Sequence, residues 1–91
     1  MVTWTIVFTS HARKDAKKLS ASGLRPKVEA VLVIVARNPF QTPPPYEKLV
    51  GEFRGAYSRR INIQHRLVYQ VIESIKTVKI LRMWTQWSGD S

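Results

Sequence analysis

One glutamate and three arginines in the second half of the chain have side chains that suit a phosphodiester. Glu47 follows a run of three prolines, and Arg60, Arg66 and Arg82 lie in segments that predict β-strands. Arginine presents a planar, permanently charged fork of donors that matches phosphate oxygens. A carboxylate beside the phosphate can remove the proton from a ribose 2′-hydroxyl. These residue types fit an RNA-cleaving site, although charged strand residues that simply face solvent are the ordinary alternative.

These side chains need a sheet to position them, and the second half of the chain predicts one. The segment Gln41 to Pro45 contains three consecutive prolines, which no interior strand or helix tolerates, so it is expected to be an extended crossing loop. Gly51 to Gly55 predicts a turn or hairpin. The expected strands are Tyr46 to Val50, Ala56 to Asn62, His65 to Ile72 and Thr77 to Trp84.

Alternation along these strands separates a polar face from a core face. In the strand from His65, Leu67, Tyr69 and Val71 are expected in the core, and Arg66 points the other way. Arg60, Arg66 and Arg82 could then converge on one concave surface that Glu47 borders. In the preceding strand the polar face holds Ser58, Arg60 and Asn62, and the other face holds Tyr57, Arg59 and Ile61.

The first half of the chain predicts one strand and two helices. Trp4, Ile6 and Phe8 alternate with threonines, which is typical of a strand with a core-facing Trp4. Ser10 is expected to cap a basic helix that runs to about Leu19. Pro26 suits the first turn of a second helix, which runs to about Arg37 and ends at Asn38-Pro39, although its β-branched run could also form a strand. The core-facing stripe of that helix is Val28, Val31, Leu32 and Val35.

The order strand, helix, helix and four strands (β-α-α-β-β-β-β) predicts an α+β fold with two helices packed on a mostly antiparallel sheet. At 91 residues the chain is expected to be a single domain, 1–91. Fifteen Lys and Arg against six Asp and Glu give a net charge of +9, which favours a polyanionic partner. Cysteine is absent and histidine occurs twice, which excludes disulfides and thiol nucleophiles and argues against a histidine-rich metal site.

No apolar run approaches the roughly 18 residues of a membrane-spanning helix. Residues 1–10 lack the pattern of a signal peptide, so a cytoplasmic protein with no membrane partner is expected. Trp84 and Trp87 could stack on RNA bases, with packing near the chain end as the alternative. His65 lies on the Leu67 side of its strand and is expected to be structural.

The segments Gly55–Asn62 and His65–Tyr69 strongly resemble the YoeB/Txe branch of the RelE-like toxins. The similarity extends over about residues 30 to 85. It includes Asn38-Pro39-Phe40, Tyr46-Glu47-Lys48-Leu49 and Leu81-Arg82-Met83-Trp84-Thr85.

This resemblance implies a microbial-ribonuclease-like fold and the toxin of a type II toxin–antitoxin system. Such toxins are ribosome-dependent mRNA endoribonucleases, or mRNA interferases, which cut mRNA in the A site by 2′-hydroxyl attack. The matching positions make Glu47 the general base, Arg66 the arginine of the transition state and Arg60 a phosphate contact. Arg59 is expected to support RNA binding or folding, and Lys48, Arg82 and Trp84 to contact RNA. No metal or other cofactor is expected, because arginines can carry the phosphate charge.

The last residues depart from the family, which ends in a histidine that acts as general acid and a tyrosine near a base. Gln86 and Trp87 occupy those positions, and Ser88–Ser91 follow. Glutamine has no titratable proton, and losing a general acid typically costs about 10²–10⁴ in rate. A weakened or inactive toxin that acts through antitoxin binding and operon autoregulation is therefore the alternative function, and a basic RNA-binding domain with no toxin role is a third.

The resemblance also names partners. It implies a cognate acidic antitoxin of the YefM/Phd type, together with mRNA and the ribosome, and a homodimer is a further expectation. Lys17 and Lys18 of the first helix are expected to meet ribosomal RNA through nonspecific electrostatics. If no RNA is bound, Glu47 and the arginines are expected to pair with one another.

Overall fold

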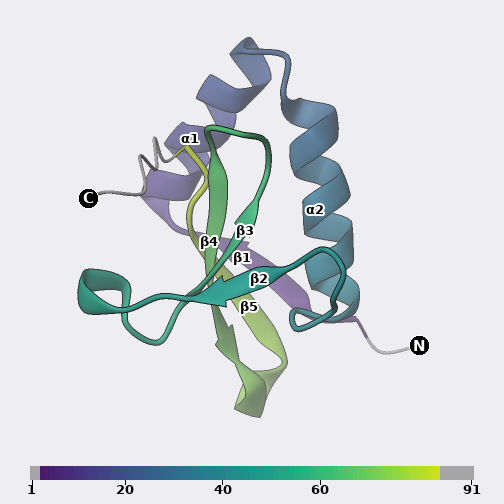
Figure 1. Cartoon of the computed structure of the whole chain (residues 1–91), viewed down its shortest axis with the longest axis vertical. Helices are drawn as coiled ribbons and strands as arrows, with labels where there is room; N and C mark the ends of the chain where they lie inside the picture. The colour runs from purple at the N-terminus through teal and green to yellow at the C-terminus, as the bar shows by residue number, and fades with distance from the viewer. Residues whose placement is uncertain (1–2, 85–91) are drawn as a thin grey trace.

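A five-stranded β-sheet with two helices packed against it forms the fold (Figure 1). The structure is a computed structural model that describes residues 3–84. The strand order is β1-β5-β4-β3-β2, with β1 parallel to β5 and the other pairs antiparallel. The predicted α+β class and element order are therefore confirmed. The strands are β1 Thr5–Phe8, β2 Tyr46–Lys48, β3 Tyr57–Arg60, β4 Arg66–Ile72 and β5 Thr77–Arg82.

The helices are α1 Ser10–Ala21 and α2 Arg25–Arg37. The expectation that Ser10 caps α1 is wrong by one residue, because Thr9 is the cap. Its Oγ1 accepts a hydrogen bond from the Ala12 N–H at 3.0 Å and donates one to the Leu81 carbonyl at 3.0 Å. One hydroxyl therefore caps α1 and ties its start to the end of β5.

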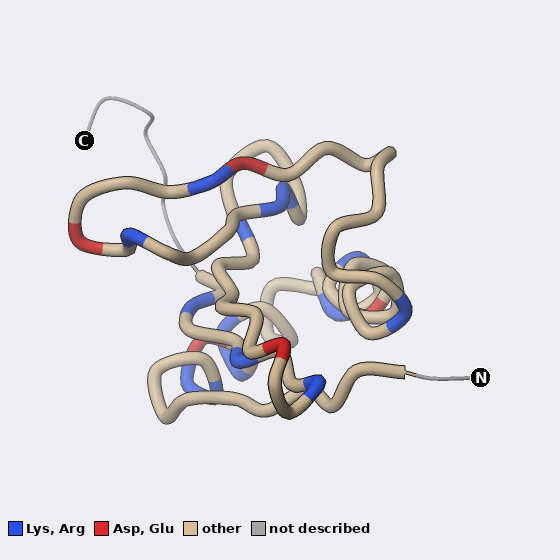
Figure 2. Tube along the Cα trace, turned by 90° about the horizontal axis from the view of Figure 1, so that it is seen from below, with Lys and Arg blue, Asp and Glu red and all other residues tan. Residues whose placement is uncertain are grey.

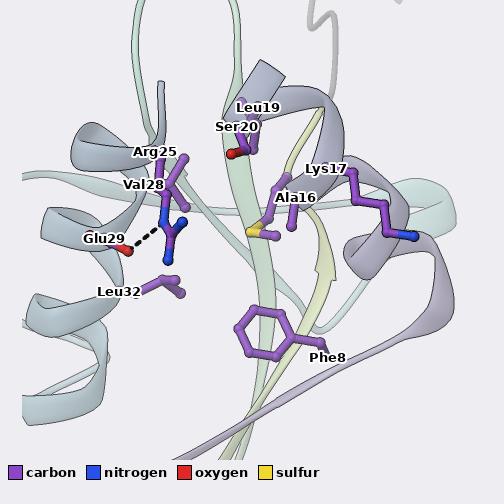
Figure 3. Close-up of a pocket in the computed structure, with 10 residues that line it drawn as sticks. Phe8, Ala16, Lys17, Leu19, Ser20, Arg25, Val28, Glu29 and Leu32 are labelled. Carbon is purple, nitrogen blue, oxygen red and sulfur yellow. Dashed lines mark hydrogen bonds and ion pairs between the residues drawn. The ribbon is translucent and has the colours of Figure 1, made fainter. Parts of the chain in front are cut away.

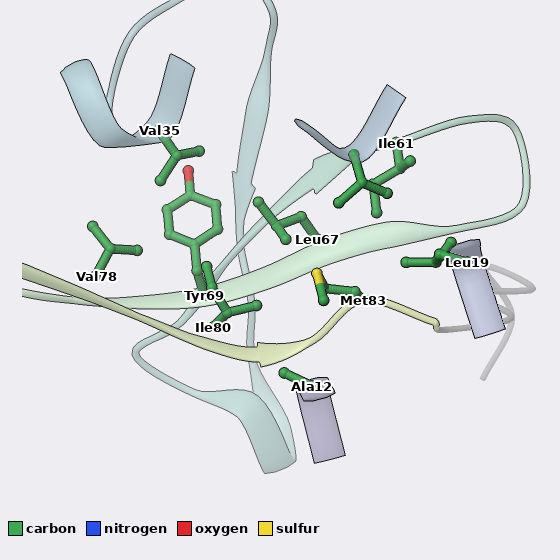
Figure 4. Close-up of a cluster of buried hydrophobic side chains, with 10 residues drawn as sticks. Ala12, Leu19, Val35, Ile61, Leu67, Tyr69, Val78, Ile80 and Met83 are labelled. Atoms are coloured by element: carbon green, nitrogen blue, oxygen red, sulfur yellow. The ribbon is translucent and has the colours of Figure 1, made fainter. Parts of the chain in front are cut away.

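The core lies between the helices and the sheet (Figure 4). Val28 and Val35 of α2 are buried, while Val33 is 52% exposed, so the β-branched run forms an amphipathic helix and the strand alternative is wrong. Trp4 is half-buried and packs against the core as expected. The fully buried sheet residues of this cluster are Leu67, Tyr69, Val78 and Ile80, and Met83 follows β5.

The strands that carry the candidate site are shorter than the sequence predicts. β2 ends at Lys48 rather than Val50. A short 3₁₀ helix of one turn, η1 Gly51–Phe53, follows it. Gly51 has a φ of +72°, a left-handed conformation that glycine adopts without strain. A second 3₁₀ turn, η2 Glu73–Ile75, joins β4 to β5. Neither α1 nor α2, the helices within residues 3–84, is long and apolar enough to cross a membrane.

A buried arginine fixes the proline-rich crossing loop to the sheet. The Arg59 side chain is 1% exposed, and its guanidinium donates to the carbonyls of Pro39 at 3.0 Å, Gln41 at 2.7 Å and Pro44 at 2.6 Å. Its Nε donates to the Tyr69 hydroxyl at 3.0 Å, and that hydroxyl donates to the Pro39 carbonyl at 2.8 Å. Burial raises the pKa of Tyr69 despite the nearby Arg59 charge. Of the two roles expected for Arg59, the structure supports folding, because the guanidinium is not available to RNA.

Candidate active site

Glu47 of β2 and Arg66, the first residue of β4, form an ion pair that spans the intervening strand β3. Glu47 of β2 lies opposite Ser58 of β3, and Ser58 lies opposite Val68 of β4. The Arg66 Nη1 is 2.5 Å from the Glu47 Oε1 and donates to the Ser58 Oγ at 3.2 Å. The Arg66 side chain is 21% exposed and that of Glu47 is 65% exposed. The structure thus brings the carboxylate and the guanidinium together on one face, where both remain accessible.

Arg60 brings a second guanidinium to this place. It is the register partner of Arg66, and it is exposed at the end of β3. Like charges directly opposite each other on a sheet are destabilising. The Glu47 carboxylate offsets part of this repulsion, and a bound anion would offset more. Lys and Arg are spread over the helices and strands (Figure 2), so net charge alone does not mark the site, whereas this convergence does.

A cavity of about 630 Å³ opens beside the ion pair. Its volume lies within the range of roughly 300–1,000 Å³ that is common for ligand sites. The residues that line it are Glu47, Ser58, Arg60 and Arg66, together with Pro44, Pro45, Ile61, Asn62 and Ile63. Arg59 therefore also positions one wall of this cavity, because it holds the Pro44 carbonyl.

Arg82 does not join this cluster, and the expected convergence of three arginines is wrong. Its Nε is 2.8 Å from the Asp15 Oδ2 on α1, and its Nη2 donates to Oδ1 at 3.3 Å. A register shift between Val68 and Tyr69 interrupts the pairing of β4 with β5 just before Arg82. Such an irregularity breaks the two-residue alternation on which the expectation depended. The ion pair with Asp15 gives Arg82 a structural role.

Asp15 is 2% exposed and was not singled out by sequence reasoning. Burial alone would raise the pKa of Asp15, but hydrogen bonds from Arg82 and from the backbone N–H groups of Met83 and Trp84, together with the Arg82 charge, outweigh it. The pKa therefore lies below its ordinary value. The one available signal was a single acidic residue in an otherwise basic helix.

Asp15→Asn is expected to lower the free energy of unfolding by about 2 kcal/mol at pH 7, because it removes the charge that binds Arg82. The pKa of Asp15 is lowered by folding, so its stabilising effect is complete above about pH 5 and is lost as the pH falls through the folded pKa. Urea unfolding from pH 7 to pH 2 should show the difference between parent and variant shrinking in acid. The matched control is Glu29→Gln, which breaks the exposed pair with Arg25 and should cost at most about 0.5 kcal/mol. If the difference in unfolding free energy between parent and Asp15→Asn stays constant down to pH 2, the charge of Asp15 does not stabilise the fold.

The remaining candidate residues lie elsewhere. Trp84 is half-buried and stacks on His65 with ring centroids 3.9 Å apart. Its ring therefore packs within the fold, which is the alternative to the expected RNA contact. His65 is 2% exposed, as expected of a structural histidine. Lys48 is exposed but does not line the cavity. Gln86 and Trp87 lie outside the described residues.

A second cavity, a groove of about 320 Å³, lies between α1 and α2 (Figure 3). Phe8, Val28 and Leu32 give it an apolar lining, and the charges at its edge include an exposed pair between Arg25 and Glu29, with Nε 2.9 Å from Oε2. The Glu29 carboxylate is paired with Arg25 of the same helix, and Arg25 is the one arginine among the described residues that line the groove. The groove therefore lacks the carboxylate with two guanidiniums that lines the first cavity.

Comparison with known proteins gives one consistent result. A model of the YoeB-like toxin of bacterial type II toxin–antitoxin systems matches residues 8–85. Toxin YoeB of Streptomyces coelicolor is 36% identical over 67 residues, which cover 71% of this chain and 80% of the relative.

Solved structures agree in fold. A YoeB/ParE toxin from Agrobacterium tumefaciens superposes with a TM-score of 0.79 at 25% identity, covering 89% of this chain and 96% of that one. A chain of the YoeB-YefM complex from Staphylococcus aureus superposes with a TM-score of 0.75 at 32% identity, covering 89% and 94%. The YoeB of S. aureus has also been solved as a dimer, with the same similarity and coverage. These structures confirm the expected RelE-like fold.

Proposed function

The chain belongs to the YoeB-like toxins of bacterial type II toxin–antitoxin systems, and from that premise we propose that it is an endoribonuclease that cuts mRNA in the ribosomal A site. The observation that carries the proposal is the contact of Glu47 with Arg66 beside Arg60, at the mouth of a cavity large enough for a nucleotide. A carboxylate can act as general base and two guanidiniums can stabilise the charge that develops on the phosphate, which are two of the contributions that RNA cleavage without a metal uses.

In the proposed reaction Glu47 accepts the proton of the ribose 2′-hydroxyl, and the 2′-oxygen attacks phosphorus. The bond from phosphorus to the 5′-oxygen breaks, which leaves a 2′,3′-cyclic phosphate and a 5′-hydroxyl. Arg66 and Arg60 stabilise the charge that develops on the non-bridging oxygens. When the phosphate binds, it competes with Glu47 for Arg66, so substrate binding itself frees the carboxylate to act as a base. The leaving 5′-oxygen takes its proton from water or from a donor group on the RNA or the ribosome.

The experiment is cleavage of mRNA on ribosomes programmed with a defined A-site codon. The full chain is expected to cut within that codon, to leave a 2′,3′-cyclic phosphate and a 5′-hydroxyl, and to leave the same mRNA intact without ribosomes. An absence of A-site cleavage, or products with a 3′-hydroxyl, would refute the mechanism.

We also propose an acidic antitoxin as the protein partner. The net charge of +9, and the exposed Arg60 beside its half-buried register partner Arg66, favour an acidic segment that covers the site. The S. aureus relative has been solved with YefM, which makes a YefM-type protein the first candidate. The dimer of the same relative supports self-association when no antitoxin is bound. Action on ribosomes would place the protein in the cytoplasm.

A second candidate function is that of a catalytically weakened toxin, which acts through antitoxin binding and operon autoregulation. The observation that favours it is Gln86, which the resemblance to the family places at the position of the acid histidine.

Gln86→His is expected to raise the A-site cleavage rate at least tenfold, because it supplies a general acid with a pKa near the working pH. Single-turnover cleavage on programmed ribosomes measures this change. Gln64→His, which places the same side chain in the turn before β4, is the control and is expected to leave the rate within about twofold. An unchanged rate in Gln86→His would mean that the missing acid does not limit this chain.

A further inference from the structure

The cavity beside Glu47 and Arg66 is also lined by residues that the proposed chemistry does not use. Pro44, Pro45 and Ile63 are apolar, and Ile63 is 88% exposed in the turn between β3 and β4. A single exposed apolar side chain is unremarkable by itself. Here, however, three apolar residues from two separate segments line the same cavity as the charged residues. That combination matches a nucleotide, which has an anionic phosphate and a flat base whose faces pack on apolar side chains.

Asn62, which also lines the cavity, has a side-chain amide oriented by hydrogen bonds. Its Oδ1 accepts hydrogen bonds from the backbone N–H groups of Gln64 at 2.9 Å and His65 at 2.7 Å. Because both partners are donors, the atom that they contact must be the amide oxygen. The turn is closed further by a hydrogen bond from the Ile61 N–H to the His65 carbonyl at 2.9 Å. Within residues 3–84 no hydrogen bond from the Asn62 Nδ2 to a protein atom is present, so this amide offers two N–H donors and no free acceptor.

We propose that Asn62 and Ile63 form a nucleobase subsite that prefers guanine over adenine, and this subsite rests on the proposed function of the neighbouring residues. The phosphate next to the base lies against Arg60 and Arg66, the base packs on Ile63, and the Asn62 amide donates to its edge. The arginines thus bind the phosphate of any nucleotide, and the turn distinguishes between the two purines.

The preference for guanine follows from the occupied oxygen of Asn62. Asparagine usually reads adenine with its oxygen and nitrogen together, accepting from N6 and donating to N7. Here the oxygen already accepts two backbone N–H groups, so only the donor remains. Guanine presents two acceptors, N7 and O6, on that edge, whereas adenine presents the donor N6 beside N7. A donor-only side chain therefore gains a contact with guanine that it cannot make with adenine.

The test is direct binding of 2′-deoxy trinucleotides, so that it does not depend on cleavage. The full chain, labelled with ¹⁵N, is titrated with trinucleotides that contain one guanosine among uridines, at each of the three positions, and with their adenosine counterparts. All carry 2′-deoxyribose, so no nucleophile is present. One net hydrogen bond corresponds to a Kd about tenfold lower for the best guanosine trinucleotide than for its adenosine counterpart. The side-chain amide signal of Asn62 is expected to shift on guanosine binding.

Asn62→Asp is the informative variant, because it keeps the oxygen that closes the turn and replaces the donor with an acceptor. Its ratio of guanosine to adenosine affinity is expected to fall from about ten to about one or below. The added charge weakens all RNA binding, so Gln64→Glu, which adds the same charge at an exposed position of the same turn, is the control. That control should lower both affinities and keep the ratio.

The outcomes separate this subsite from the nuclease proposal. A ratio near one in the parent chain, or a ratio that Asn62→Asp leaves unchanged, overturns the subsite even if A-site cleavage is observed. A guanosine preference that Asn62→Asp removes supports the subsite even in a chain that does not cleave. Preserved backbone amide spectra show that each variant is folded.

Discussion

Glu47→Gln is expected to lower the rate of A-site cleavage by about 10²–10⁴-fold, the range typical for loss of a general base. Glutamine has nearly the same shape as glutamate but does not accept a proton at neutral pH. The fold should be unaffected, since the Glu47 side chain is 65% exposed and a pair of this kind contributes at most about 1 kcal/mol. Single-turnover cleavage on programmed ribosomes gives the rate, and urea unfolding gives the stability.

The control for this result is Glu52→Gln. It makes the same chemical change at an exposed position on η1, outside the set of residues that line the cavity. It is expected to keep the parent rate within about twofold, which excludes a general effect of charge on ribosome binding. If Glu47→Gln cuts at the parent rate, the carboxylate is not the base, and the contact with Arg66 would then serve only the fold.

Arg59→Met is expected to produce the largest loss of stability, about 3–5 kcal/mol, because it removes four hydrogen bonds made by a buried guanidinium. The partners that lose hydrogen bonds are the carbonyls of Pro39, Gln41 and Pro44 and the hydroxyl of Tyr69. The total free energy of unfolding of a small domain is only about 5–15 kcal/mol, so the variant should be partly unfolded near 37 °C. Urea and thermal unfolding, followed by circular dichroism, measure the loss.

Its control is the neighbouring arginine. Arg60→Met removes an equal charge one residue further along β3, where the side chain is exposed, and should change stability by no more than about 0.5 kcal/mol. Arg59→Lys keeps the charge but cannot reach the four acceptors at once, so it should lose much of the stability that Arg59→Met loses. Equal stability of the variants at positions 59 and 60 would show that the loop does not depend on this guanidinium.

These two adjacent arginines show what the sequence could predict. Strand alternation correctly puts Arg60 on the polar face with Ser58, and Arg59 on the other face with Tyr57. Alternation cannot show that backbone carbonyls of the distant proline loop surround Arg59, because that requires the tertiary path of residues 39–45. Composition does not reveal this burial either, since arginine is rarely buried without partners.

The candidate site itself was predictable in part. The proline run and the strand pattern placed Glu47 and Arg66 within reach of each other, and the ion pair bears out that geometry. Register was needed to find Ser58 between them, and a single sequence does not contain register. Arg82 was misplaced because the shift between Val68 and Tyr69 leaves no signal in the pattern of apolar residues. The role of Asn62 as the acceptor that closes the turn depends on backbone geometry that spacing alone does not reveal.

The position of β5 in the sheet has a consequence for biosynthesis. This strand is the last of the described strands to be translated, yet it lies between β1 and β4 and pairs with both. Until it leaves the exit tunnel, the amino-terminal strand has no neighbour, and the sheet cannot close. A nascent chain therefore cannot assemble the whole sheet before β5 has been synthesised.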